Sequence, residues 1–212
     1  MIDGFLRKMI TRFGETEAKE NPLEQFVLWF RDAAAESPGD WFDAGVMTLA
    51  TSGAGGQVSA RTVLLMRFDE EGFTFYSNYG SQKARQLSNN PRAALLFQWP
   101  HVQRQVRVEG KVEKVSRAES SLYFRSRPRL SQLGAAVSPQ SEIIPSRDFV
   151  EEKARQLQDA LGNQPVPVPE TWGGYRLRPE LIEFLDHREN RLHDRVRYLR
   201  QEGAWRVERL AP

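Results

Sequence analysis

The chain has 212 residues, of which 40% are hydrophobic, and its formal net charge is only +2. This length allows one sizeable core, and the small net charge argues against a nucleic-acid partner. The absence of cysteine excludes disulfides, thiolate catalysis and zinc–thiolate sites. No apolar run approaches the ~20 residues that span a bilayer, and residues 1–20 lack the apolar stretch of a signal peptide. We therefore expect a cytoplasmic protein without a membrane partner.

The first predicted elements are an N-terminal arm, a helix and three strands. We expect residues 1–20 to form a flexible arm. The run Asn21-Pro22-Leu23-Glu24 starts a helix, with asparagine as N-cap, proline at the first helical position and glutamate at the capping-box position. Helical spacing of apolar residues continues until Ser37-Pro38-Gly39. The period then changes to two, which predicts strands over residues 46–51, 58–66 and 73–78.

The remaining elements are further strands with helices inserted between them. The glycines at 53, 55 and 56 lie between two strands and lack a following Lys-Ser/Thr, so they predict a hairpin turn and not a phosphate loop. Helices are expected over residues 81–89, from the capping box at 116–119, and over 146–161. Strands are expected over residues 93–99, 103–115, 174–185, 194–200 and 204–209. This order predicts a mainly β domain over residues 21–212, an antiparallel barrel with flanking helices.

Three residues of the predicted third helix are candidates for binding a phosphate. Tyr123, Arg127 and Ser131 are four positions apart, so one helix would carry them on one face. A planar guanidinium with flanking hydroxyl groups suits a dianionic phosphate. The alternative is a basic helix face in contact with solvent.

Other polar residues stand where a barrel strand would be apolar or where a helix begins. Arg61 and Gln105 interrupt strand-like runs, for which edge strands are the alternative explanation. Lys83 falls in the first turn of a predicted helix, where it opposes the helix dipole unless an anion binds there. No pair of the three histidines has the spacing of a helical metal site, so we expect no metal.

The chain carries a series of short sequence segments between residue 61 and the C-terminus, and their order and spacing are informative. They are Arg61-Thr62-Val63-Leu64-Leu65, Phe75-Tyr76-Ser77-Asn78, Ser81-Gln82-Lys83, Asn90-Pro91, Arg104-Gln105-Val106, Tyr123-Phe124-Arg125-Ser126-Arg127-Pro128, Ser138-Pro139-Gln140-Ser141, Trp172-Gly173-Gly174-Tyr175, Glu183-Phe184, Arg191-Leu192-His193-Asp194-Arg195 and Glu208-Arg209-Leu210-Ala211-Pro212. In this order and spacing they resemble the FMN-dependent pyridoxine (pyridoxamine) 5′-phosphate oxidases. The resemblance covers residues 21–212.

The resemblance implies a fold, a cofactor and a reaction. The fold is an FMN-binding split β-barrel, assembled as a homodimer with FMN in the subunit interface. The reaction oxidises pyridoxamine 5′-phosphate or pyridoxine 5′-phosphate to pyridoxal 5′-phosphate in vitamin B6 biosynthesis or salvage, with O2 as acceptor and hydrogen peroxide as product. Two alternatives stay open: a flavin oxidase of the same fold with another substrate, as in phenazine pathways, and a flavin- or pyridoxal-phosphate-binding protein with little turnover.

The resemblance also assigns roles to individual residues. Those that match FMN-contacting positions are Arg61, Thr62, Val63, Leu64, Leu65, Met66, Tyr76, Ser77, Gln82, Lys83, Gln105, Gln140, Ser141, Leu185 and Arg195. Those that match substrate-contacting positions are Met66, Tyr123, Arg127, Ser131, Arg191 and His193. Of these, Arg191 and His193 are the implied catalytic pair that faces the pyridine ring.

The chain departs from the family pattern at three of these positions. Met66 stands where the family usually has a lysine that reaches the substrate phosphate, Gln82 where an arginine assists the flavin phosphate, and Leu185 where a tryptophan packs on the flavin. The N-terminal arm also lacks an Arg-Arg-x-Tyr element. Candidates to replace the missing charge are Arg125, Arg129 and Arg188.

Overall fold

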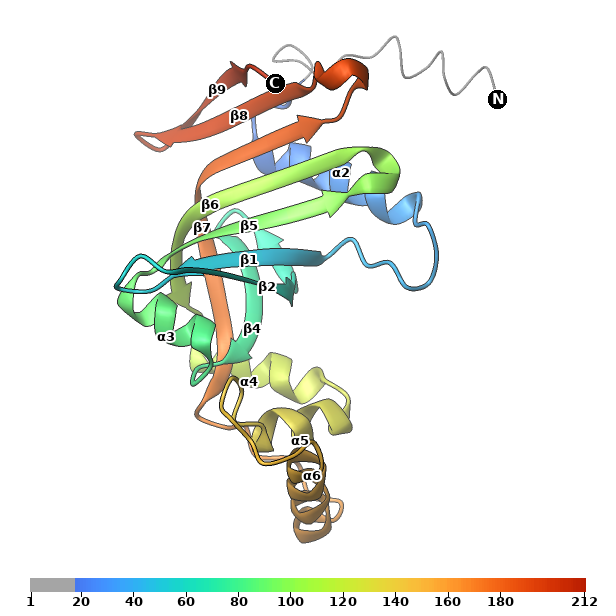
Figure 1. The fold of residues 1–212 in the computed structure, drawn as a ribbon, viewed down its shortest axis with the longest axis vertical. Coiled ribbons are helices and arrows are strands. Elements are labelled where there is room, and N and C mark those ends of the chain that lie inside the picture. Colours follow the sequence, from blue (N-terminus) through green and yellow to red (C-terminus); the bar gives the residue numbers. More distant parts are fainter. Residues whose placement is uncertain (1–17) are drawn as a thin grey trace.

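The computed structural model describes residues 18–212, and nine antiparallel strands in this part of the chain form one curled sheet (Figure 1). Most of the arm expected over residues 1–20 lies outside the described residues. The strands are β1 (Val46–Ser52), β2 (Val58–Leu64), β3 (Arg67–Asp69), β4 (Gly72–Asn78), β5 (Arg92–Trp99), β6 (Arg104–Lys114), β7 (Trp172–Asp186), β8 (Asp194–Gln201) and β9 (Ala204–Leu210).

The long strand β7 explains why the barrel is split. Its first half pairs with β4, and its second half pairs with β8, which continues to β9. Both halves also pair with β6, across a bulge between Glu109 and Gly110. A Cβ atom at Gly110 would lie 1.9 Å from the carbonyl oxygen of Arg178, so only glycine allows this close approach. The sheet order β2-β1-β5-β6-β7-β4-β3 therefore curls at one end and opens toward β8 and β9 at the other.

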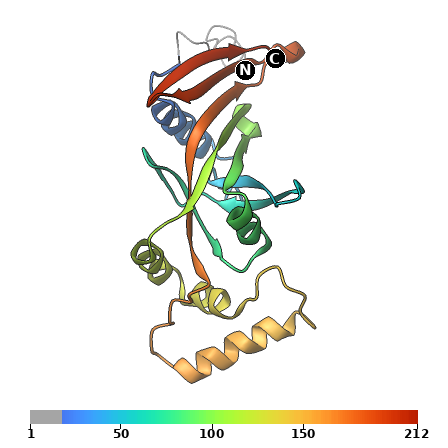
Figure 2. The same cartoon turned by 90° about the vertical axis from the view of Figure 1, so that its left-hand side faces the viewer.

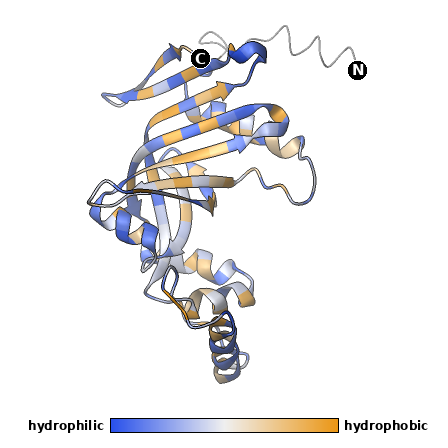
Figure 3. Ribbon diagram, in the orientation of Figure 1, coloured by the Kyte–Doolittle hydropathy of each residue, from blue (hydrophilic) through white to orange (hydrophobic). Residues whose placement is uncertain are grey.

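The helices cover the sheet at one side and extend from one end of it. They are α2 (Pro22–Ala35), α3 (Gln82–Asn89), α4 (Arg117–Ser126), α5 (Arg129–Val137) and α6 (Asp148–Leu161), with short 3-10 turns η1 (Pro100–Val102) and η2 (Glu189–Arg191). Figure 2 shows α4, α5 and α6 as a lobe at the end opposite β8 and β9. Helix α6 is mostly hydrophilic (Figure 3) and has no buried residue. No helix within residues 18–212 is long and apolar enough to cross a bilayer.

The main core lies between α2 and the concave face of the sheet. Asn21 caps α2 as predicted, since its side chain accepts a hydrogen bond from the Leu23 N–H at 2.9 Å. Phe26 is fully buried, and its ring packs edge-on against Phe73 and Phe97 at 5.0 Å. A second, smaller core joins the helical lobe to the barrel and consists of Phe124, Leu133, Val166 and Trp172.

The predicted strands and the hairpin turn at 53–56 are confirmed, with two differences. The short strand β3 was not predicted. The strand predicted over residues 58–66 ends at Leu64. Leu65 N–H still donates to Gly45, next to β1, but Met66 N–H donates to Thr74 of β4. The apolar run in the sequence continues through this corner and so conceals it. Met66 consequently lies at a corner between β2 and β3 and not inside a strand.

The single helix predicted to carry Tyr123, Arg127 and Ser131 on one face is wrong. Helix α4 ends at Ser126, and Arg127 adopts extended backbone angles with φ −73° and ψ 151°. The following Pro128 is the physical reason, because proline disfavours the α conformation of the residue before it. Helix α5 then starts at Arg129, so the chain turns a corner in the middle of the predicted phosphate site.

Candidate active site

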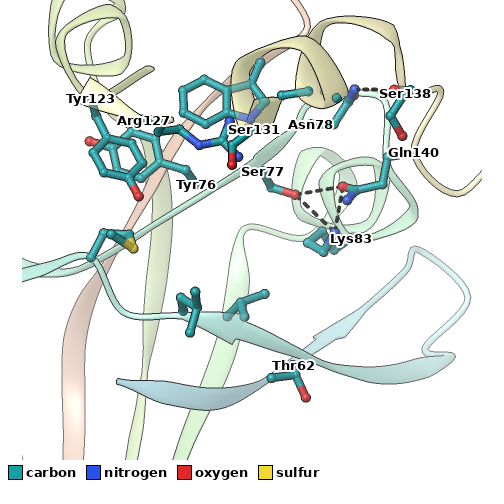
Figure 4. Close-up of a pocket in the computed structure, with 16 residues that line it drawn as sticks. Thr62, Tyr76, Ser77, Asn78, Lys83, Tyr123, Arg127, Ser131, Ser138 and Gln140 are labelled. Carbon is teal, nitrogen blue, oxygen red and sulfur yellow. Dashed lines mark hydrogen bonds between the residues drawn. The ribbon is translucent and has the colours of Figure 1, made fainter. Parts of the chain in front are cut away.

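A cavity of about 490 Å³ opens between the β2 and β4 strands and the helical lobe (Figure 4). It is lined by Thr62, Val63, Leu64, Met66, Tyr76, Ser77, Asn78, Lys83, Tyr123, Arg127, Ser131, Gly134, Ala135, Ser138, Gln140 and Trp172. Eleven of these positions match roles implied by the family resemblance. The cavity therefore brings together strand, helix and loop residues that are up to 110 positions apart in the chain.

At one end of the cavity, Lys83 is a buried cation with only neutral partners. Its Nζ donates to Ser77 Oγ and Gln140 Oε1 at 3.1 Å each, and to Ser81 Oγ at 3.4 Å. No carboxylate pairs with it among residues 18–212. Burial lowers the pKa of Lys83, and the nearby charge of Arg61 lowers it further. A buried ammonium group at the start of α3 without a counter-charge can bind an anion.

Arg61 lies beside this end of the cavity but outside its lining. Its guanidinium donates to Thr51 Oγ1 and the Leu49 carbonyl, and to Gln86 Oε1 at 3.2 Å. Burial lowers the pKa of Arg61. Because Arg61 and Lys83 repel each other, an anion near both would stabilise this end of the cavity.

At the other end, the corner at Pro128 still brings Tyr123, Arg127 and Ser131 to the same cavity. One terminal nitrogen of Arg127 is buried without a hydrogen-bond acceptor in the described chain. Burial lowers the pKa of Arg127, with Tyr123 acting in the opposite direction. A guanidinium with a spare donor and two neighbouring hydroxyl groups can bind a phosphate.

Stacked aromatic rings form the wall between these two ends. The ring centroids of Tyr76 and Tyr123 are 4.1 Å apart, and Trp172 lies nearly parallel to Tyr76 at 5.3 Å. Burial, followed by the charges of Glu119 and Tyr123, raises the pKa of Tyr76 to about 12, so its phenol stays protonated. With the apolar residues of β2 across the cavity (Figure 4), this wall suits a flat ring system.

The other predicted site residues lie apart from this cavity, at the open end of the sheet. Strand register aligns Gln105 with Leu185, and Leu185 with Arg195, in one row across β6, β7 and β8. Gln105 borders a second cavity of about 360 Å³. Arg191 is exposed in η2, and His193 Nδ1 accepts the Arg188 N–H at 3.0 Å. The structure therefore divides the predicted residues into two separate groups.

Arg195 belongs to a set of paired charges on this outer face of the sheet. The carboxylate of Glu183 is only 3% exposed and accepts from Arg195 Nε at 2.8 Å and from Arg107. Burial favours a higher pKa for Glu183, but the hydrogen bonds and charges of Arg107 and Arg195 outweigh it and lower the pKa. Farther along the same strands, Arg197 pairs with Glu208. The guanidinium groups on this face have carboxylate partners.

None of the three arginines considered as replacements for the missing lysine lines the cavity. Arg129 donates to Gln158 Oε1 and to the carbonyls of Gly162 and Gln164, which ties α5 to the end of α6. Arg188 pairs with aspartates on β7 and β8, and Arg125 is exposed. None of these arginines therefore supplies the missing charge within this chain's cavity, which Met66, 40% exposed, borders without a cation in the lysine's place.

Some predicted residues lie near the cavity without lining it, and others that line it were missed. Leu65, Gln82 and Ser141 are outside the lining, the last in a left-handed conformation with φ 72°. The residues missed by sequence reasoning are Asn78, Gly134, Ala135, Ser138 and Trp172. The Trp-Gly-Gly run at 172–174 was a usable signal, because two consecutive glycines indicate a close approach to the backbone, here by Tyr79 at Gly173 and by Tyr76 at Gly174.

The chain belongs to the pyridoxamine 5′-phosphate oxidase family. Residues 41–160 match the family model for pyridoxamine 5′-phosphate oxidase, and residues 172–212 match the pyridoxine 5′-phosphate oxidase C-terminal dimerisation region. The pyridoxine/pyridoxamine 5′-phosphate oxidase of Rubrobacter xylanophilus is 49% identical over 209 residues, covering 98% of this chain and 95% of the relative. That of Acaryochloris marina is 50% identical over 199 residues, covering 93% and 89%.

Solved structures share the fold. PhzG from Burkholderia lata, in complex with tetrahydrophenazine-1-carboxylic acid, has a TM-score of 0.86 and 26% identity, covering 96% of this chain and 98% of that one. A pyridoxamine 5′-phosphate oxidase-related, FMN-binding protein from Nostoc punctiforme has a TM-score of 0.70 and 18% identity, covering 91% and 98%. The predicted split β-barrel is confirmed.

Proposed function

Because the chain belongs to the pyridoxamine 5′-phosphate oxidase family, we propose that the two cationic ends of its cavity bind two different phosphates. The protein is an FMN-dependent oxidoreductase that converts pyridoxamine 5′-phosphate or pyridoxine 5′-phosphate to pyridoxal 5′-phosphate. The observation that carries the proposal is that Lys83 and Arg127 both line one cavity, each desolvated and neither paired with a carboxylate in the described chain. We propose that residues 21–212 form one oxidase domain.

The end with Lys83 would hold the phosphate of FMN. Ser77 and Gln140 contact the same ammonium group, and Arg61 adds a second positive charge beside it. The flat cavity walls, Tyr76 on one side and the β2 residues on the other, suit the flavin ring. Bound there, FMN would supply the hydride acceptor for oxidation at C4′ of the substrate. The protein contributes position and electrostatics. We propose O2 as the final acceptor, with hydrogen peroxide as product.

The end with Arg127 would hold the 5′-phosphate of the substrate. The guanidinium offers parallel donors, and Tyr123 and Ser131 offer hydroxyl groups beside it. A substrate with another anionic group is the second candidate, and one observation favours it: Met66 stands at this end in place of a cation. The chain is nevertheless 49–50% identical to the vitamin B6 oxidases and 26% identical to PhzG, which favours the phosphate ester.

We further propose that two copies of the chain complete each site. The match to the family's dimerisation region supports a homodimer. This region, residues 172–212, contains Leu185, Arg191, His193 and Arg195. These residues lie apart from the cavity of their own chain. If a second copy presents them to this cavity, the two separate groups form one site with FMN in the subunit interface.

Oxygen consumption and pyridoxal 5′-phosphate formation by the FMN-loaded protein test the reaction. We expect turnover with pyridoxamine or pyridoxine 5′-phosphate, and a much higher KM for unphosphorylated pyridoxamine. Turnover of tetrahydrophenazine-1-carboxylic acid but not of the phosphate esters would overturn the proposal.

Mixed dimers test the shared site. Arg127→Ala damages the cavity, and His193→Ala damages the other group. A mixed dimer of these two chains keeps one undamaged site, so random mixing restores about a quarter of the wild-type activity in a symmetric dimer. As a control, mixing Arg127→Ala with Tyr123→Phe chains damages every site and restores none. Equal activity in both mixtures would contradict a site made from two chains.

A further inference from the structure

Arg127 reaches the cavity without the usual partners of a buried guanidinium. Its backbone is extended because Pro128 follows, so it has left helix α4. One of its terminal nitrogens is buried and has no acceptor in the described chain. Its Cζ lies 5.0 Å from the ring centroid of Trp172. An aromatic face therefore takes the place that a carboxylate usually has.

Trp172 is itself fixed by contacts from several elements. It begins β7, pairs with Asn78 of β4 and is only 5% exposed. Phe124 of α4 packs against it at 5.0 Å with an interplanar angle of 70°. Tyr76 of β4 lies nearly parallel to it, with an interplanar angle of 12°. Because these contacts come from both the barrel and the helical lobe, the indole ring has little freedom to move.

The backbone after Trp172 allows this stack. A Cβ atom at Gly174 would lie 2.8 Å from Cε1 of Tyr76 and 2.6 Å from Cγ2 of Val115. Real Cβ atoms do not approach other atoms this closely, so a larger residue would displace the Tyr76 ring. Glycine at this position thus keeps Tyr76 flat beside Trp172, and Trp172 under the guanidinium of Arg127.

We propose that Trp172 is a positioning residue for the substrate phosphate, which holds the Arg127 guanidinium by a cation–π contact and leaves its N–H donors for the anion. A carboxylate in this place would also hold Arg127, but it would neutralise the charge and occupy the same donors. The inference rests on the proposed assignment of Arg127 to the substrate phosphate.

Two substitutions at position 172 separate positioning from general packing. Trp172→Leu keeps an apolar side chain but removes the aromatic face, whereas Trp172→Phe keeps an aromatic face. In FMN-loaded protein we expect Trp172→Leu to raise the KM for pyridoxamine 5′-phosphate about tenfold, with kcat and FMN content little changed. Trp172→Phe should recover most of the loss. For unphosphorylated pyridoxamine, the KM of all three proteins should be similar.

A binding measurement keeps this inference separate from the proposed reaction. Calorimetric titration of pyridoxal 5′-phosphate into FMN-loaded protein should give the same order of affinities: wild type, then Trp172→Phe, then Trp172→Leu. A matched control is Trp205→Leu. It removes the indole of β9 that lies under Arg200 of β8, and it should leave the affinity unchanged. Equal affinities of wild type and Trp172→Leu would overturn the inference. If wild type binds the ligand but oxidises no phosphate ester, only the proposed reaction fails.

Discussion

The cavity and the outer face of β6–β9 use the same cationic groups in opposite ways. On the outer face, Arg107 and Arg195 share the carboxylate of Glu183. In the cavity, Lys83 contacts only neutral oxygens, and Arg127 lies over an indole ring. On the outer face, neighbouring strands supply the counter-charge for each arginine. In the cavity, no carboxylate of the described chain does so for Lys83 or Arg127.

This difference shows how the two regions should respond to substitution. A paired charge stabilises the folded chain, and removing one partner leaves the other uncompensated. An unpaired, desolvated cation costs stability until an anion binds. Substitution should therefore damage folding on the outer face, whereas in the cavity it should damage binding and leave folding intact.

The largest effect is expected for Glu183→Gln on the outer face. It leaves Arg107 and Arg195 close together without their shared carboxylate. We expect the free energy of unfolding of the FMN-free protein to fall by about 3 kcal/mol, the lower end for a broken buried pair, since both arginines are partly exposed. Urea denaturation at matched protein concentration measures it. As a control, Glu180→Gln, which breaks the exposed pair with Arg92, should cost at most about 1 kcal/mol.

The pH dependence of the free energy of unfolding is a second test of the Glu183 carboxylate. The pKa of Glu183 is lower in the folded than in the unfolded protein. Its contribution is therefore fully present above the unfolded pKa of about 4.3 and is lost as pH falls through the lower folded value. The difference between wild type and Glu183→Gln should shrink progressively below about pH 4. A difference independent of pH would mean that the carboxylate charge does not matter.

Lys83→Met should separate binding from folding most clearly. We expect FMN affinity to fall by about 2.5 kcal/mol, or roughly seventyfold, because a charged hydrogen bond to phosphate is lost. The free energy of unfolding without FMN should not fall, because a buried and uncompensated charge has been removed. Fluorescence titration with FMN and urea denaturation check the two parts. Lys111→Met, at an exposed position, is the control. Retention of wild-type FMN affinity would remove Lys83 from the flavin site.

Arg127→Ala should raise the KM for pyridoxamine 5′-phosphate by about thirtyfold, equivalent to about 2 kcal/mol, while FMN stays bound. The physical reason is the loss of the guanidinium that faces the cavity without an acceptor of its own. Steady-state kinetics measure it. Arg125→Ala, two residues earlier and exposed, is the matched control and should be near wild type. An unchanged KM for Arg127→Ala would mean that the phosphate binds elsewhere.

The smallest effect is expected for Met66→Lys, which adds a cation to the corner of the cavity. We expect the KM for pyridoxamine 5′-phosphate to fall about fivefold, or about 1 kcal/mol, since the side chain is partly exposed and the new charge is screened. The gain should decrease with added salt. Met66→Leu, which adds no charge, serves as control. A higher KM for the lysine variant, with FMN content unchanged, would indicate an apolar substrate group near Met66.

The sequence alone predicted the local elements well, because their signals are local. Asn21 caps α2, Ser116 caps α4 by accepting the Glu119 N–H at 3.0 Å, and the glycines at 53–56 turn the first hairpin. The predictions failed where the conformation of a residue depends on its neighbour in the chain or in space. Spacing placed Tyr123, Arg127 and Ser131 on one helix face, but the rule for residues before proline, available in the sequence at Pro128, takes precedence.

The contacts that the sequence could not predict are those set by the pairing of strands. The pairing of Arg195 with Glu183 follows from the register of β7 with β8, and spacing along the chain does not reveal it. The separation of the predicted site into two groups likewise depends on how β7 changes partners along its length. Trp172 was visible only as part of a motif, because its contact with Arg127 requires the helical lobe to fold back on β7.

The bulge between Glu109 and Gly110 has a consequence for how the length of this protein can vary. Gln105, Leu185 and Arg195 share one face only because β6, β7 and β8 keep a fixed register. Inserting a single residue between Gln105 and the bulge would turn the preceding side chains of β6 to the opposite face. This part of the strand therefore tolerates no insertion or deletion. The exposed loop at residues 54–57, between β1 and β2, is where length variation would be tolerated.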